Sequence, residues 1–204
     1  MRNSHGRLSL RYIGAVRGGK STIVEALTQR VEDLGYSISH TSRPPRTGEI
    51  DGEDYHFVDR KAFTKMVDEG AFVEWARVYG HLYGTSFSSL NRVMASGLDV
   101  IADVDIQGGR NIKDRFARSV LIFLVPPSMK TLEARLRGRQ SEDEASLLNR
   151  LKEAEEEMKN CAWYDYIVIN DVLEQAVEAV ETIIRAQRLR TSCQLPRIKK
   201  MFDI

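Results

Sequence analysis

One short stretch of this chain restricts its fold more than any other. Residues 14 to 21 read Gly-Ala-Val-Arg-Gly-Gly-Lys-Ser and match the pattern G-x-x-x-x-G-K-[ST] at every fixed position. An apolar run, Leu8 to Ile13, precedes the stretch and predicts a strand. Apolar residues recur at helical spacing after it, and Gly35 is expected to end that helix. These apolar positions are Ile23, Leu27, Val31 and Leu34. Strand, glycine loop and helix in this order favour a phosphate-binding loop.

The residue types of this loop suit a nucleoside triphosphate. Glycines allow backbone N–H groups to turn toward phosphate oxygens, and the N-terminus of the following helix adds its dipole. Lys20 would reach the β- and γ-phosphates, and Ser21 would offer its hydroxyl to Mg²⁺. The alternative is a glycine-rich turn with an exposed lysine, which the strand and the helix on either side disfavour.

Composition argues against several other classes of protein. With 204 residues, the chain is long enough for one core with insertions. Its net charge of +1 gives no sign of a nucleic-acid partner or of an acidic membrane. Met1 to Arg7 is polar, and no apolar run approaches membrane-spanning length. Cys161 and Cys193 lack metal-site spacing and are expected to be reduced, which suggests a cytoplasmic protein.

Strand and helix patterns alternate along much of the chain. Further apolar runs predict strands at Leu98 to Val104, Val120 to Val125 and Tyr166 to Ile169. Helical patterns lie between them, notably at Met129 to Leu136 and at Glu144 to Met158. This alternation predicts an α/β fold with a parallel sheet that helices cover on both faces. Ligands of such sheets bind at the carboxyl ends of the strands. The residues at those ends are Gly14, Asp103, Pro126 and Asn170.

The segment between the first helix and Leu98 follows a different pattern. Tyr36 to His40 is a short β-like segment, and Thr41 to Asp54 is a loop dense in proline, glycine and charge. Tyr55 to Ser86 is rich in aromatic residues and turn glycines, so we expect a small insert with its own core. Arg43 and Arg46 flank prolines in the loop, and guanidinium groups bind phosphate in a fixed plane. A loop of this composition is as often simply solvated.

Two other groups of charged residues are candidates for the same chemistry. Asp103 ends an apolar strand, and an acid there can hold Mg²⁺ on a nucleotide; Asp105 points the same way because side chains alternate along a strand. The alternative for either is a turn aspartate. Arg135, Arg137, Arg139 and Arg150 lie on and after the helix pattern that starts near Met129, and Arg135 and Arg139 share a helix face and could converge on one anion. Their alternative is surface pairing with the acids at 142 to 144, which contributes little.

Six stretches of the chain, taken in order, resemble guanylate kinase, especially the bacterial enzymes. The resemblance covers about residues 8 to 190. Each stretch alone is a weak signal, whereas the six in this order are specific. The stretches are Gly14 to Ser21, Ser39-x-x-x-Arg43-x-Pro45-Arg46-x-Gly48-Glu49-x-x-Gly52-x-Asp54-Tyr55-x-Phe57-Val58, Glu74-Trp75-Ala76, Tyr83-Gly84-Thr85, Asp103-Val104-Asp105-x-Gln107-Gly108 and Val168-Ile169-Asn170-Asp171.

The resemblance implies a reaction and a division of the chain. The reaction is transfer of the ATP γ-phosphoryl group to GMP or dGMP, with Mg²⁺, to give ADP and GDP or dGDP. The division is a P-loop core at residues 1–38, 93–133 and 156–204, a GMP-binding insert at 39–92 and a helical lid at 134–155. It implies no nucleic-acid or membrane partner, and it leaves a homo-oligomer open.

The resemblance also implies roles for residues at matching positions. Those expected at ATP are Gly14, Ala15, Val16, Arg17, Gly18, Gly19, Lys20, Ser21, Thr22 and Asn170. Those expected at GMP are Ser39, Arg43, Arg46, Glu49, Tyr55, Glu74, Tyr83, Thr85 and Asp105. Lys20, Arg43, Arg135, Arg139 and Arg150 are expected to act in catalysis, and Ser21 and Asp103 to hold the metal.

The expected base contact is chemically sensible in its own right. The pairing edge of guanine offers N1–H and N2–H₂ donors, and a carboxylate such as that of Glu74 only accepts. Adenine would face it with an unprotonated N1, and a site left with unpaired buried polar groups rejects the wrong base.

The chain departs from the family pattern in its phosphate loop. Ala15, Val16 and Arg17 stand where the family usually has Pro-Ser-Gly. One alternative is therefore a guanylate-kinase-like binding module with impaired catalysis, although Lys20 and Ser21 are present. Another is a kinase for a different small phosphate acceptor, which the Ser39, Glu74 and Asp105 set disfavours. The basic segment Arg185 to Lys200 predicts a solvated helix, with self-association as its alternative.

Overall fold

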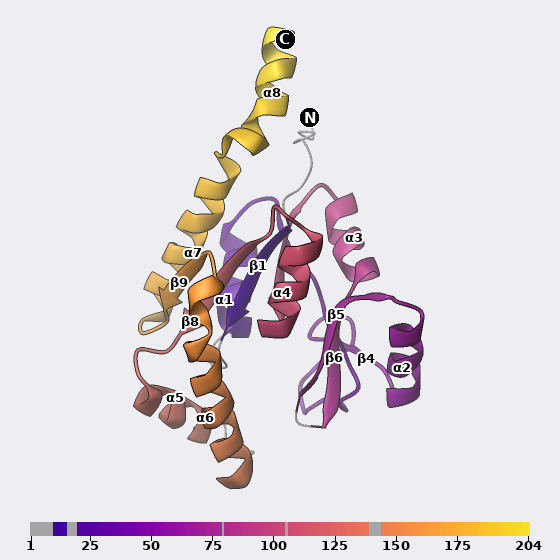
Figure 1. The fold of residues 1–204 in the computed structure, drawn as a ribbon, viewed down its shortest axis with the longest axis vertical. Helices are drawn as coiled ribbons and strands as arrows, with labels where there is room; N and C mark the ends of the chain where they lie inside the picture. Colours follow the sequence, from indigo (N-terminus) through magenta and orange to yellow (C-terminus); the bar gives the residue numbers. More distant parts are fainter. Residues whose placement is uncertain (1–9, 16–19, 79, 105, 139–143) are drawn as a thin grey trace.

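The computed structural model describes residues 10–15, 20–78, 80–104, 106–138 and 144–204. For residues 10–15, 20, 21 and 146 it gives the course of the backbone alone. The chain builds a larger sheet covered by helices and a smaller second sheet beside it (Figure 1).

Five parallel strands form the larger sheet, in the order β2-β7-β1-β8-β9. Ile13 of β1 lies beside Asp103 of β7 and Ile122 of β8, so the three central strands end close together. The strands are β1 (Leu10–Ala15), β2 (Leu34–Tyr36), β7 (Asp99–Val104), β8 (Val120–Val125) and β9 (Tyr166–Ile169). The α/β fold with a parallel sheet is confirmed.

Helices cover both faces of this sheet because successive residues of its strands point to opposite sides. In β7, Ala102 packs with one set of helices and Ile101 with the other. The first set is α3 (Phe87–Ala95), α4 (Ile106–Arg115), α5 (Met129–Arg137) and α6 (Glu144–Lys159). The second is α1 (Lys20–Arg30) and α7 (Leu173–Arg188). Each face therefore has its own apolar core.

The second sheet has the order β4-β3-β6-β5 and lies to one side of the main sheet, with α2 against it (Figure 1). Phe63 of α2 stacks on Phe72 of β5, with ring centroids 4.5 Å apart, and both pack with Leu82. The elements are β3 (His40–Thr41), β4 (His56–Phe57), α2 (Arg60–Asp68), β5 (Phe72–Val78) and β6 (His81–Ser86). The second sheet thus has a small core of its own, separate from the two large ones.

The C-terminal part of the chain forms an extended arm. After the 3₁₀ turn Cys161–Trp163, strand β9 and α7, helix α8 (Thr191–Phe202) continues away from the body of the molecule (Figure 1). Cys161 and Cys193 are free thiols. Over the part of the chain that the structure describes, no helix combines the length and apolar character needed to cross a membrane.

The predicted end of the first helix was wrong. Helix α1 ends at Arg30, the chain turns at Asp33 with a φ of 57°, and Gly35 lies within strand β2. Glycine is needed there for a different reason, since a Cβ at residue 35 would lie 2.5 Å from Cγ1 of Val93 in α3. A periodic pattern does not reveal such a close approach between distant segments.

The other element predictions held with small shifts. The strands at Val120–Val125 and Tyr166–Ile169 have the expected bounds, whereas β1 ends two residues later than expected, and the predicted start at Leu8 lies outside the described residues. The β-like segment Tyr36 to His40 is divided between the end of β2 and the start of β3.

Replacing Gly35 by Ala should lower the free energy of unfolding by about 1–3 kcal/mol, because the added methyl overlaps Val93 and Leu98. Urea denaturation measures the change. Gly138→Ala is the matched control, since a Cβ there would have no described neighbour closer than 3.5 Å. Equal losses in the two variants would contradict the close approach of α3.

His40 should make the fold sensitive to acid. Its ring packs 4.7 Å from that of His56 and 5.7 Å from that of Phe72. Burial, helped by His56 and Arg92, lowers the pKa of His40 to about 4. The unfolded chain, with an ordinary pKa near 6.5, binds a proton that the folded chain does not, so the free energy of unfolding should fall as the pH falls from about 6.5 toward 4. His40→Gln should flatten this slope in pH-dependent urea titrations, and an unchanged slope would contradict the prediction.

Candidate functional site

The context of the phosphate loop is as the sequence predicts. Strand β1 ends at Ala15 between β7 and β8, and helix α1 begins at Lys20. The N-terminus of α1 therefore lies at the carboxyl edge of the sheet, where it favours an anion. Val16, Arg17, Gly18 and Gly19 lie outside the described residues. Ser21 and Thr22 follow Lys20 in the first turn of α1.

Asp103 lies near the carboxyl end of β7, beside β1. Its charge acts on two tyrosines. Burial first, and then Asp103, raises the pKa of Tyr36 and of Tyr55. Tyr55 directly precedes β4 of the second sheet. The Asp103 carboxylate, at the end of the main sheet, is therefore close enough to raise the pKa of a side chain beside the second sheet. Asp105, the other acid predicted here, lies outside the described residues.

Arg43 is the centre of a polar cluster on the second sheet. Its guanidinium donates to both carboxyl oxygens of Glu49, at 2.9 and 2.8 Å, and its Nε donates to the Tyr83 hydroxyl at 3.2 Å. The side chains of Arg43 and Glu49 are only 11% and 19% exposed. Burial raises the pKa of Glu49, but the hydrogen bonds from Arg43 and the Arg46 N–H outweigh it, so that pKa is lowered.

The cluster orients Arg43 toward further residues that the sequence singled out. The guanidinium lies 5.6 Å from the ring centre of Tyr55, which in turn packs against Tyr83. Arg46 is exposed, and its backbone N–H donates to Glu49 at 2.7 Å. Glu49 therefore contacts Arg43 and Arg46 rather than standing apart as an acid on its own.

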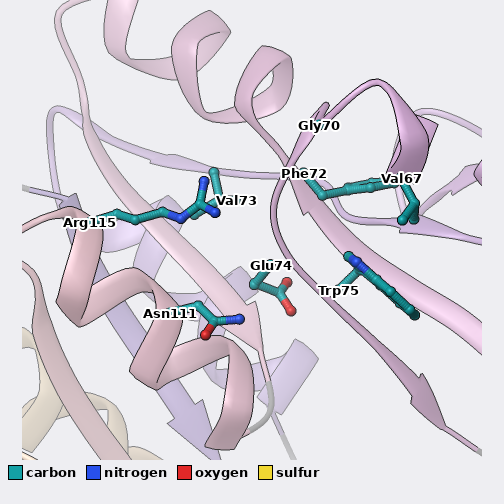
Figure 2. Close-up of a pocket in the computed structure, with 8 residues that line it drawn as sticks. All are labelled: Val67, Gly70, Phe72, Val73, Glu74, Trp75, Asn111 and Arg115. Atoms are coloured by element: carbon teal, nitrogen blue, oxygen red, sulfur yellow. The ribbon is translucent and has the colours of Figure 1, made fainter.

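Glu74 of β5 forms the centre of a second polar group. It is buried, with 5% of its surface exposed, and its Oε1 accepts the N–H of Thr85 at 2.9 Å. The Thr85 hydroxyl is 3.4 Å from that of Ser39, and both residues are buried. Glu74 also lines a cavity of about 220 Å³ between β5 and α4, together with Asn111 and Arg115 (Figure 2). The structure thus brings together Ser39, Glu74 and Thr85, three of the residues expected at GMP.

The arginines of the predicted lid have different partners. Arg135 of α5 donates to the backbone carbonyls of Asn170 at 2.8 Å and Asp171 at 3.2 Å, beside the end of β9. Arg137 pairs with Glu133 and Glu144, the surface arrangement considered as the alternative for this group. Arg150 lies half-buried on α6, and Arg139 lies outside the described residues. Convergence of Arg135 and Arg139 on one anion therefore stays a prediction.

The sequence does not show how two features of the site are built. The pairing of β5 with β6 shifts register between Phe72 and Glu74, a β-bulge. Gly108 of α4 lies against the Glu74 carboxyl group, where a Cβ would be 2.6 Å from Oε2. The family motif includes Gly108, but only the folded structure shows what it touches.

Comparisons with known proteins agree with this geometry. A family model described as guanylate kinase matches residues 10–187. A guanylate kinase of Geobacter sulfurreducens is 41% identical over 186 residues, or 91% of this chain and 92% of that protein. A guanylate kinase of Chromobacterium violaceum is 45% identical over 184 residues, which are 90% of this chain and 88% of that protein. The crystal structure of guanylate kinase from Anaplasma phagocytophilum has a TM-score of 0.78 at 28% identity, covering 95% of this chain and 94% of that one.

Arg43→Lys should weaken binding of a nucleoside monophosphate about tenfold, because a single ammonium cannot keep two parallel bonds to Glu49 and still direct a further N–H donor to phosphate. Titration calorimetry with GMP measures the affinity. Arg77→Lys, an exposed position on β5 of the same sheet, is the matched control and should bind as the unaltered chain does. Equal affinity of all three proteins would show that the phosphate is held elsewhere.

Proposed function

The chain belongs to the guanylate kinase family, and we propose that it transfers the γ-phosphoryl group of ATP to GMP or dGMP with Mg²⁺ at the phosphates. The observation that carries this proposal is the buried Glu74, which accepts the N–H of Thr85. The Thr85 hydroxyl contacts that of Ser39, just before β3, and Arg43 follows the same strand. A carboxylate that recognises the base and an arginine that binds phosphate are what a purine monophosphate requires.

The second sheet would bind the acceptor through two groups of side chains. The GMP phosphate would be held by Arg43, Arg46, Tyr55 and Tyr83. Glu49 would act one step removed, because its bidentate contact fixes the plane of the Arg43 guanidinium. A carboxylate repels phosphate, so holding the arginine suits Glu49 better than touching the ligand.

Guanine would be recognised by Glu74, Ser39, Thr85 and Asp105. Glu74 would accept hydrogen bonds from N1–H and N2–H₂, and the hydroxyls of Ser39 and Thr85 would supply further polar contacts. Because these groups are withdrawn from water, a base that cannot pair with them would leave buried polar atoms unsatisfied. AMP is rejected on this account.

ATP would bind at the carboxyl edge of the main sheet, in the loop from Gly14 to Thr22. The Ser21 hydroxyl and the Asp103 carboxylate are oxygen donors of the kind that Mg²⁺ prefers, and this ion usually takes one or two protein oxygens together with substrate phosphates. Bound there, it would neutralise charge on the β- and γ-phosphates.

In the transfer step, an oxygen of the GMP phosphate attacks the γ-phosphorus as the bond to the β–γ bridging oxygen breaks, which leaves ADP. Lys20 stabilises charge on the transferring group. Arg135, Arg139 and Arg150 would add positive charge when residues 134–155 close over the site, and closure would exclude water. Asn170, with its carbonyl held by Arg135, would contact the adenine side of ATP.

This mechanism implies the three-part division proposed above, with a core at 1–38, 93–133 and 156–204, an insert at 39–92 and a lid at 134–155. The separate apolar cores of the two sheets support an insert that moves as a unit. A cytoplasmic location suits substrates of this kind. Nothing in the comparisons favours the binding-module alternative, and the relatives named above are all guanylate kinases.

Lys20→Ala should lower kcat about a hundredfold or more while the fold persists, because the lysine stabilises charge that develops only in the transition state. A coupled ADP-release assay and a thermal melt test the two parts. Lys61→Ala, an exposed position in α2, is the control and should keep full activity. An active Lys20→Ala variant would rule out this phosphate loop.

Glu74→Gln should reduce kcat/KM for GMP much more than any activity toward AMP, because the amide replaces one acceptor by a donor facing N1–H or N2–H₂. Steady-state rates with both acceptors give the ratio. Glu69→Gln, at an exposed position just after α2, should leave it unchanged. If the ratio is also unchanged in Glu74→Gln, guanine is recognised elsewhere.

A further inference from the structure

The carboxyl group of Glu74 is confined on two sides. Its Oε1 accepts the Thr85 N–H at 2.9 Å, which ties it to strand β6. Its other oxygen faces the first turn of α4, where a Cβ at residue 108 would lie 2.6 Å from Oε2 and 2.8 Å from Cδ. Real Cβ atoms do not approach other atoms so closely, so the carboxyl group occupies space that only a glycine at residue 108 leaves open.

A β-bulge directs the side chain to this place. Phe72 pairs with Ser86 and Glu74 with Thr85, so two steps along β5 correspond to one along β6. Consecutive side chains then point the same way. Figure 2 shows Val73 and Glu74 on the side of Asn111 and Arg115 of α4, and Phe72 and Trp75 on the opposite side, where Phe72 reaches Val67 of α2. Without the bulge, Glu74 would share the side of Phe72, which packs in the core of the second sheet.

We propose that Gly108 is a positioning residue for base recognition, because it lets the Glu74 carboxyl group lie against α4 while keeping its bond to Thr85. A methyl group at residue 108 would push the carboxyl away from α4 and move the acceptor atoms relative to the guanine edge. Displacements of about 1 Å at a recognition site are enough to reduce activity strongly. The proposal rests on the function proposed above, in which Glu74 accepts the guanine donors.

A purely structural role for Gly108 makes a different prediction. The same Cβ would lie 2.9 Å from Cβ of Val104, so an alanine would also strain the packing of α4 against β7. That strain is independent of the side chain at residue 74. The contact with the carboxyl group does depend on that side chain, because Glu74→Asp withdraws the carboxyl group by one methylene. The two roles are therefore separated by the residue at position 74.

The test compares the unaltered chain, Gly108→Ala, Glu74→Asp and the double variant, with KM values for GMP and for ATP and a thermal melt for each. Gly108→Ala should raise KM for GMP about tenfold and change KM for ATP less than about twofold. Glu74→Asp should also raise KM for GMP. In the double variant, Gly108→Ala should add much less than tenfold, because the contact that it disturbs is gone. Gln107→Ala, an exposed neighbour in the same turn, is the control and should leave both KM values unchanged.

Each remaining outcome also decides the question. Gly108→Ala could raise KM for GMP and KM for ATP alike, or raise KM for GMP by the same factor with Glu and with Asp at residue 74. In either case the glycine serves only the packing of α4, and the proposal is overturned. If Gly108→Ala does not fold, recovery of the melting transition in the double variant supports the contact, and failure to recover overturns it. An unaltered chain that does not phosphorylate GMP overturns the proposed function, whereas the melting temperatures of the four proteins still report on the contact itself.

Discussion

The parallel pairing of β1 with β7 and β8 is the constraint on which the rest of the structure depends. It places the end of β1, the start of α1 and Asp103 at one edge of the main sheet. The second sheet is inserted between β2 and β7, and α5 and α6 between β8 and β9, so both leave the main sheet at the carboxyl ends of its strands. Both the second sheet and the α5–α6 segment are thereby attached beside the carboxyl edge of the main sheet, which is where ligands of open α/β sheets bind.

The polar groups through which we propose that GMP is recognised are largely withdrawn from water and already paired. Burying a carboxylate or a guanidinium is costly unless hydrogen bonds compensate. Arg43 has Glu49 and Tyr83, and Glu74 has the Thr85 N–H. These contacts hold the side chains in fixed orientations, so less conformational entropy is lost when a ligand binds. The same pairing is why we propose that Glu49 acts by holding Arg43 and does not contact the ligand itself.

Structure could be predicted from the sequence where it is determined by residues nearby in the chain. The phosphate-loop context, the parallel α/β fold and the bounds of β8 and β9 followed from local patterns. The predictions failed or were incomplete where distant segments meet. Gly35 accommodates α3 rather than ending α1, and Gly108 accommodates Glu74. The bulge at Phe72 to Glu74 is equally hidden, because only the pairing with β6 creates it. Contacts of this kind arise from packing, and no periodicity of a single segment encodes them.

The central claim is that the second sheet selects guanine for phosphoryl transfer from ATP. The most direct measurement is the steady-state rate of ADP formation with ATP, Mg²⁺ and GMP, AMP, CMP or UMP in turn. The account predicts a kcat/KM for GMP on the order of 10⁴-fold above that for AMP, as expected of a site built from buried hydrogen-bonding groups. ADP formation that does not depend on GMP, or that is as fast with AMP, would contradict it.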